Sequence, residues 1–148
     1  MFSENYSRQT AIASATKVLA ADLTDHELAT LARSEEAKVR AAVAERPTTP
    51  LTSLLLLAQD VAPAVRAGVA RNQRPDLPVE MRQDLAKDMS SEVVYALIEN
   101  PVTPDEILAK LTRSFHRDYA GAAKQEIYKR KTAWRHEIAY GEAVNQPR

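Results

Sequence analysis

The chain has 148 residues, with 20 basic side chains, 20 acidic side chains, three histidines and no cysteine. This length fits one domain with a sizeable core, and the zero net charge provides no overall field that would recruit nucleic acid or a membrane. The lack of cysteine excludes disulfides, thiolate metal sites, iron–sulfur clusters and a cysteine nucleophile.

Helix-forming residues dominate the sequence, and no alternating strand pattern is present. In chain order, the first predicted helix is Thr10–Leu19, which would belong to a degenerate first unit. The next begins at Thr24, where Thr24 and Glu27 have the spacing of a capping box. An apolar face starting at Leu28 follows, so we expect an amphipathic helix here.

From Val39 onward the chain repeats itself. The segment Val39–Pro50 returns in altered form from Val65, and again as Val93–Pro104, at offsets of 26 and 28 residues (65 − 39 and 93 − 65). A fixed period in this range is typical of stacked repeats. We therefore predict an all-α solenoid of about four degenerate two-helix repeats.

Polar residues next to the predicted helices indicate where they begin. Thr103 is predicted to cap a helix that has Pro104 at its first position, and Thr49 with Pro50 repeats half of this signal. The second helix of each repeat is expected to start after a polar cap, at Ser34, Asp60 or Ser90. Small inward residues such as Gly68 predict close approach between neighbouring repeats.

The C-terminal segment differs from the repeats. Residues 115–140 contain no proline and are predicted to form one long capping helix, followed by a disordered tail at 141–148. Six apolar residues lie near one stripe of this helix: Phe115, Tyr119, Ala123, Ile127, Trp134 and Ile138. The only tryptophan, Trp134, is expected either to pack on the final repeat or to anchor a partner.

The best copies of the repeat, Val39–Pro50 and Val93–Pro104, follow the pattern V-R-x-x-V-A-x-N-P-x-T-P and precede a Leu-rich helix. This pattern resembles the leucine-rich repeat variant family over about Asp22–Ser114. The resemblance implies a right-handed superhelix in which α-helices alternate with short 3₁₀ helices, and it supplies no catalytic residues. A second likeness is to HEAT repeats, whose Asp and Arg six residues apart form a ladder between repeats. Asp60 and Arg66 have this spacing, so a partial ladder is expected.

Signals for an enzyme are poor. The sequence has no G-x-S-x-G, phosphate-binding loop, H-E-x-x-H or Gly-rich dinucleotide turn. His26 lies between two acids whose side chains point in different directions, and His116 and His136 are too far apart to share a metal. We expect no catalytic residue, no metal and no cofactor.

Two groups of residues are candidates for partner binding. Arg40 and Arg66 occupy equivalent positions in successive repeats, with Arg74 and Tyr95 nearby. This row could bind phosphates or acidic side chains, but the favoured alternative is pairing with Asp60, Asp88 and Glu92 of neighbouring repeats.

The second group, on the last helix, consists of Lys124, Tyr128, Lys131, Trp134 and Arg135. Lys124, Tyr128, Lys131 and Arg135 share one face, which is typical either of a contact surface or of a solvated outer face.

The leading hypothesis is a non-catalytic scaffold that binds another protein in the cytoplasm. The alternative is nucleic-acid binding through the arginine row and the basic helix. A homodimer through the C-terminal helix is a further hypothesis. No membrane contact is expected, because Met1–Gln9 lacks signal-peptide features and the longest apolar run, Leu54–Ala58, is too short to span a bilayer.

Overall fold

The computed structural model describes residues 22–144, with side chains described as far as residue 140. Within this range every regular element is an α-helix and no strand occurs, which confirms the all-α prediction. The helix predicted at Thr10–Leu19 lies outside the described residues. The chain divides into two compact units, residues 1–103 and 104–148, where the sequence predicts a single domain.

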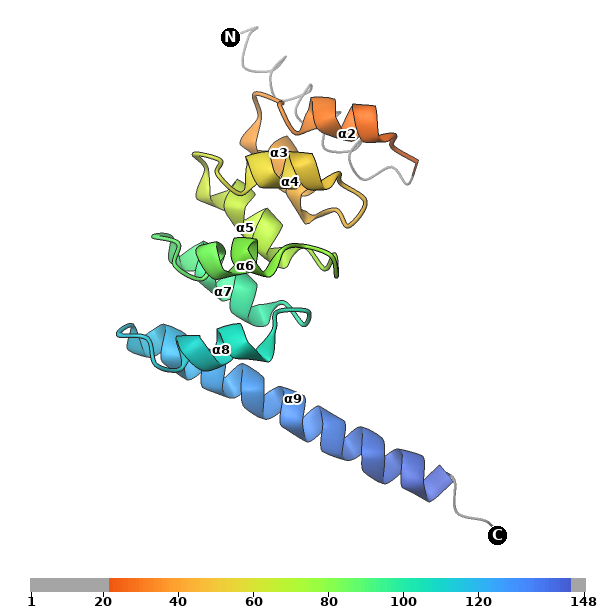
Figure 1. Ribbon diagram of the computed structural model, residues 1–148, viewed down its shortest axis with the longest axis vertical. Helices are drawn as coiled ribbons and strands as arrows, with labels where there is room; N and C mark the ends of the chain where they lie inside the picture. Colours follow the sequence, from red (N-terminus) through yellow and green to blue (C-terminus); the bar gives the residue numbers. More distant parts are fainter. Residues whose placement is uncertain (1–21, 145–148) are drawn as a thin grey trace, which may run out of the picture. The chain divides into compact units, whose positions relative to one another are not determined.

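The helices alternate between a first and a second helix of each repeat (Figure 1). The first helices are α2 (Asp25–Leu31), α4 (Leu51–Leu57), α6 (Val79–Leu85) and α8 (Asp105–Leu111). The second helices are α3 (Ala37–Glu45), α5 (Pro63–Arg71), α7 (Ser91–Glu99) and α9 (Arg117–Val144). Their starts confirm the predicted period, because both sets begin at offsets of 26, 28 and then 26 residues (for the first helices 51 − 25, 79 − 51 and 105 − 79).

The helix type differs from what the resemblance implies. Both helices of each described repeat are α-helices, and no 3₁₀ helix occurs between residues 22 and 144. The first helices have only seven residues. Bonds that span three residues occur in the turn that ends them, as in the amide of Ser34 donating to the carbonyl of Leu31.

Unit 1 is a stack of repeats in which α5 packs between α3 and α7. Val43, Val69 and Leu97 are fully buried in this stack. Gly68 confirms the predicted close approach: a Cβ atom at this position would lie 2.7 Å from the carbonyl oxygen of Ala41 in the preceding repeat. The packing of these helices is that of an α-solenoid.

The predicted capping box at the start of α2 is present. The Thr24 side chain accepts a hydrogen bond from the Glu27 amide, and the Glu27 carboxylate accepts one from the Thr24 amide. The caps predicted at Thr49 and Thr103 are wrong. Pro50 and Pro104 occupy the N-cap positions, and neither α4 nor α8 has a side-chain cap.

These two threonines instead complete the preceding helices. The Thr49 hydroxyl donates to the carbonyl of Val43, and the Thr103 hydroxyl donates to the carbonyl of Leu97, both at 2.6 Å. The last carbonyls of a helix have no partner within it. Each buried threonine therefore gives a second donor to a helix-end carbonyl that also accepts from the C-cap amide, that of Arg46 or Asn100.

Two of the second helices, α3 and α5, begin three residues after their predicted caps, whereas α7 begins directly after Ser90. Ser34 and Asp60 do not cap, but each accepts a hydrogen bond from the amide two residues further on, and so do Asp88 and Ser114. Ser90 occupies the N-cap of α7 without a side-chain bond. A short turn held by a Ser or Asp side chain therefore connects the two helices of every described repeat.

In unit 2, α8 packs on the first half of α9. Ala120 and Ala123 are buried there, and Arg130 pairs with Asp105 at 2.9 Å and with Glu126 at 3.2 Å. A seven-residue helix is about 10 Å long, whereas the 28 residues of α9 extend for about 42 Å. The α8 helix therefore covers only a part of α9.

The predicted C-terminal helix needs two corrections. It starts at Arg117, so Phe115 precedes it and is fully exposed, and it continues to Val144, four residues beyond the predicted end. Of the predicted apolar stripe only Ala123 is buried, while Tyr119 and Ile127 are half-buried and Phe115, Trp134 and Ile138 are exposed. No helix between residues 22 and 144 has the length and apolar character needed to span a membrane.

Candidate interaction surfaces

The arginine row of unit 1 is engaged in ion pairs between repeats. Nε and Nη2 of Arg40 donate to both carboxylate oxygens of Asp60 at 2.8 and 3.1 Å. Arg66 forms the same two-pronged pair with Asp88, at the same distances. Nη1 of each arginine also donates to a backbone carbonyl of its own repeat, that of Ser34 or Asp60. In the structure, Arg40 and Arg66 therefore pair with aspartates of the next repeat, which is the interpretation that the sequence favoured.

The two aspartates of this ladder are held in their charged form. Burial alone would raise the pKa of Asp60, but the hydrogen bonds from Arg40 and from the Ala62 amide outweigh it, so its pKa is lowered. The same balance, with Arg66 and the Ser90 amide, lowers the pKa of Asp88. Donating a hydrogen bond to a carboxylate favours the charged guanidinium, and the pKa of both arginines is raised.

A second ladder, which sequence reasoning missed, runs through buried asparagines. The Asn72 side-chain amide donates to the carbonyls of Ala44 and Arg46 in the preceding repeat, at 2.8 and 3.0 Å. Asn100 donates to the carbonyls of Ala70 and Asn72 at 2.8 and 2.9 Å. Both are the C-cap residues of α5 and α7, and this shared position of an asparagine in two repeats was a signal that the sequence offered.

Arg74 belongs to the loop that makes the third repeat two residues longer. Loop 72–78 has seven residues, where loops 46–50 and 100–104 have five. Arg74 pairs with Asp76 and donates to the carbonyl of Thr49. Its hydrogen bond with Asp76 raises the pKa of Arg74. This predicted site residue therefore ties the longer loop to the repeat before it.

Arg82 supports the same loop from inside. The equivalent residues of the other described repeats are the buried leucines Leu28, Leu54 and Leu108, yet Arg82 is only 4% exposed. Its guanidinium donates to the carbonyls of Arg74 and Leu77 at 2.8 and 3.0 Å, while Nε has no partner. Burial lowers the pKa of Arg82. We conclude that Arg82 satisfies the carbonyls that the two extra residues bring into the interior.

The α9 candidates are the predicted site residues with the greatest exposure. Lys124, Tyr128, Lys131 and Arg135 are exposed, and Trp134 is 63% exposed. None of the ion pairs among the described side chains includes these three cations. Tyr95 on α7 is half-buried and belongs to the other candidate group.

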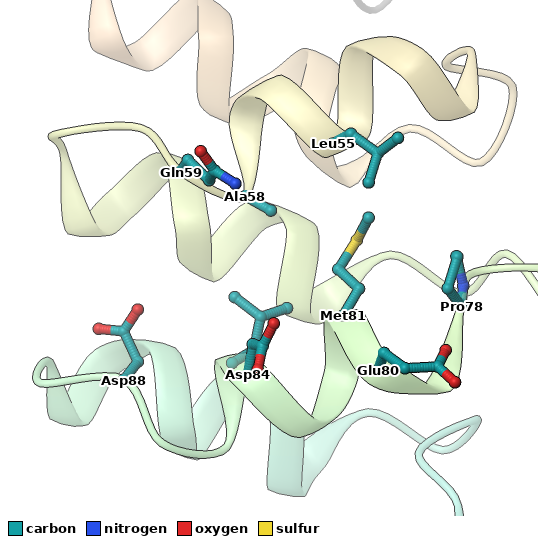
Figure 2. A pocket seen from close by; sticks show the side chains of 9 residues that line it. Leu55, Ala58, Gln59, Pro78, Glu80, Met81, Asp84 and Asp88 are labelled. Carbon is teal, nitrogen blue, oxygen red and sulfur yellow. The ribbon is translucent and has the colours of Figure 1, made fainter.

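A groove lies between α4 and α6 in unit 1 (Figure 2). It has a volume of about 250 Å³, and its lining includes Leu55, Met81 and Leu85. The carboxylates of Glu80 and Asp84 lie along its α6 side, and Asp88 lies at one end. A second hollow of about 220 Å³ lies at the ends of the second helices and mixes charges of both signs, from Glu45, Arg71 and Glu99.

Exposed apolar side chains also mark the turns between paired helices. Val61 and Met89 in unit 1 and Phe115 in unit 2 are almost completely exposed. Each directly follows the Asp or Ser that holds its turn, so all three occupy the same repeat position. Aligning the repeats at that position would have found them from the sequence.

The histidines and acidic residues of the described part of the chain were candidates for a metal site. No group of three or more His, Asp or Glu side chains able to hold a metal ion occurs among them. His26 is exposed, and the His116 ring lies 4.9 Å from the Tyr119 ring. Of the ion pairs described in unit 1, Arg40–Asp60 and Arg66–Asp88 join neighbouring repeats, and Arg74–Asp76 lies within one loop.

The repeat geometry and its ladders are those of a stacked helical repeat. Residues 37–61 match the family model of the leucine rich repeat variant. The match covers α3, α4 and the loop that joins them, which contains the Val39–Pro50 copy, and it confirms the resemblance. No curated protein and no solved structure matches the chain. Residues 37–61 are thus similar to one leucine rich repeat variant, and the helix pairs on either side repeat the same two-helix arrangement.

Proposed function

We propose that the chain is a non-catalytic repeat scaffold that binds another protein through α9. The observation that carries this proposal is the exposure of large apolar side chains along that helix from Tyr128 onward: Tyr128, Trp134, Ile138 and Tyr140. Aromatic residues dominate the energetics of protein interfaces when they enter a pocket on a partner. A helix on which such side chains are exposed is suited to insert them into a pocket of a partner protein.

The ladders of unit 1 support the same proposal. Arg40, Arg66 and Arg74 already donate to carboxylates and carbonyls of the stack. An arginine row that binds phosphate would have to break these bonds. The nucleic-acid alternative therefore rests on the cations of α9 alone, and it predicts an affinity that falls steeply with salt.

The experiment uses the purified chain as bait, with Trp134→Ala and Tyr128→Ala combined as the test variant. Lys129→Ala is the matched control, because Lys129 is exposed on the opposite face of α9. We expect a partner protein that is retained by the control, lost with the aromatic variant, and bound directly after purification. Equal capture by both variants would contradict the proposed surface. Tight binding of duplex DNA or RNA that weakens steeply with salt, with no protein retained, would favour the alternative.

A further inference from the structure

The groove between α4 and α6 has the size of an anchor site for one large side chain. Its volume of about 250 Å³ is below the range of about 300–1,000 Å³ that is usual for small-molecule pockets. Figure 2 shows Met81 rising from α6 toward Leu55 of α4, so that apolar side chains meet across the groove. Leu55 is 50% exposed there. These features indicate a protein side chain as the occupant, in place of a cofactor or a metabolite.

Leu55, one of the residues that line the groove, departs from the repeat pattern. The positions equivalent to Leu55 are Ala29, Gln83 and Ala109, so no other described repeat has a large apolar residue there. The core of the stack does not need Leu55, because Leu54 and Leu57 already provide the buried face of α4. An exposed leucine beside a hollow is typical of a binding surface.

The edge of the groove is acidic. Glu80 and Asp84 are both exposed on α6, one helical turn apart, and neither belongs to an ion pair among the described side chains. Asp88, by contrast, is already paired with Arg66. A partner that fits the groove must therefore combine one large apolar anchor with cations about one turn apart. A nucleic acid or an anionic membrane surface would be repelled.

One face of α9 has this chemistry. Lys131, Trp134, Arg135 and Ile138 fall within an arc of roughly 100° on a helix of 3.6 residues per turn. All four are exposed. Lys131 and Arg135 are four residues apart, as are Glu80 and Asp84, and such pairs have Cβ atoms about 5–6 Å apart on both helices.

We propose that the groove binds this face of α9 from a second copy of the chain, with Trp134 in the hollow and Lys131 and Arg135 against Glu80 and Asp84. The inference rests on the proposed function in so far as α9 is the binding surface, and it adds a second copy of the chain as a ligand of that surface. The contact joins two different surfaces of the chain, and it is therefore heterologous.

The test measures self-association by sedimentation velocity from about 1 μM to about 100 μM, the range in which weak contacts dissociate. Trp134 is the only tryptophan, so its fluorescence reports directly on the contact. The groove variant is Glu80→Lys with Asp84→Lys, and the helix variant is Lys131→Glu with Arg135→Glu. Matched controls are Glu106→Lys, which alters the α8 residue equivalent to Glu80, and Lys129→Glu on the opposite face of α9.

We expect the wild type and both controls to associate as concentration rises, with a blue shift of Trp134 emission. Each test variant should associate at least about tenfold more weakly, and Trp134→Ala should do the same. An equimolar mixture of the groove and helix variants should associate again, because each supplies the surface that the other lacks. Circular dichroism would show that the variants keep their helices.

Two results would overturn the proposal. A wild type that stays monomeric throughout this range has no such contact. A groove variant that associates as strongly as the wild type would show that α9 pairs with something other than the groove, such as another α9. The proposed function stands or fails separately, because it is measured by the loss of a different captured protein with the Trp134 and Tyr128 variant.

Discussion

Replacing Gly68 with alanine tests how closely the repeats approach each other. Gly68 lies on the face of α5 that packs on α3, and an added Cβ would be 2.7 Å from the Ala41 carbonyl oxygen and 3.0 Å from the Ala44 Cβ. The usual distance between a carbon and a carbonyl oxygen is about 3.3 Å or more, so the helices would have to separate by roughly 0.6 Å. The nearest obstacle is backbone, which cannot rotate away as a side chain can.

The magnitude follows from two opposing effects. Overpacking of this kind costs about 1–3 kcal/mol, while alanine in place of glycine within a helix contributes about 0.5–1 kcal/mol of stability. We expect Gly68→Ala to lower the free energy of unfolding by about 1–2 kcal/mol. Gly121→Ala is the matched control, since a Cβ at this exposed site on α9 would meet nothing within 4 Å. It should raise the free energy of unfolding by about 0.5–1 kcal/mol.

Urea unfolding followed by circular dichroism measures both variants. The two substitutions should shift the midpoint in opposite directions without changing the slope. A Gly68→Ala protein as stable as the wild type would refute the reasoning, because it would show that α3 and α5 can move apart at no cost.

Three further predictions concern the buried polar groups of unit 1. Asn72→Ala should lower the free energy of unfolding by about 1–3 kcal/mol in urea titrations, because it removes the side-chain donor to two carbonyls of the preceding repeat, of which that of Arg46 still accepts from the Thr49 amide. Folding lowers the pKa of Asp60 and Asp88, so their contribution to stability is present above the unfolded pKa of about 3.9 and is lost as pH falls through the lower folded values. Replacing both with asparagine should flatten the fall in stability below about pH 4. Arg82→Leu should speed amide hydrogen exchange in loop 72–78, and unchanged exchange there would refute the proposed support.

Local sequence signals predicted the α-helices and their spacing well. The capping box at Thr24 and the 26- and 28-residue offsets depend on residues close in the chain, and the structure confirms both. Predictions whose outcome depends on how a side chain packs in the folded chain were less accurate. Thr103 has the sequence of an N-cap, but Pro104 takes that position and the Thr103 hydroxyl reaches the carbonyl of Leu97.

The arginines of unit 1 show the same difference between what the sequence predicts and what the packing of the repeats decides. Equivalent repeat positions were enough to predict that Arg40 and Arg66 align, and to offer Asp60 and Asp88 as partners. Whether these arginines face a ligand or their neighbours depends on how the repeats stack, and the distances of 2.8 Å to the carboxylates give the answer. Exposure of Trp134 likewise depends on how far α8 reaches along α9.

The sequence by itself determined the repeat, its period and the helical fold, because these follow from hydrophobic spacing and turn residues within one unit. Only the tertiary structure decided which polar groups belong to the stack and which remain available. Arg82 illustrates the reason: in the sequence it is one more charged residue on a helix, but in the stack it takes the place of a buried leucine. Burial demands a donor for every carbonyl, and that demand arises only when distant segments pack together.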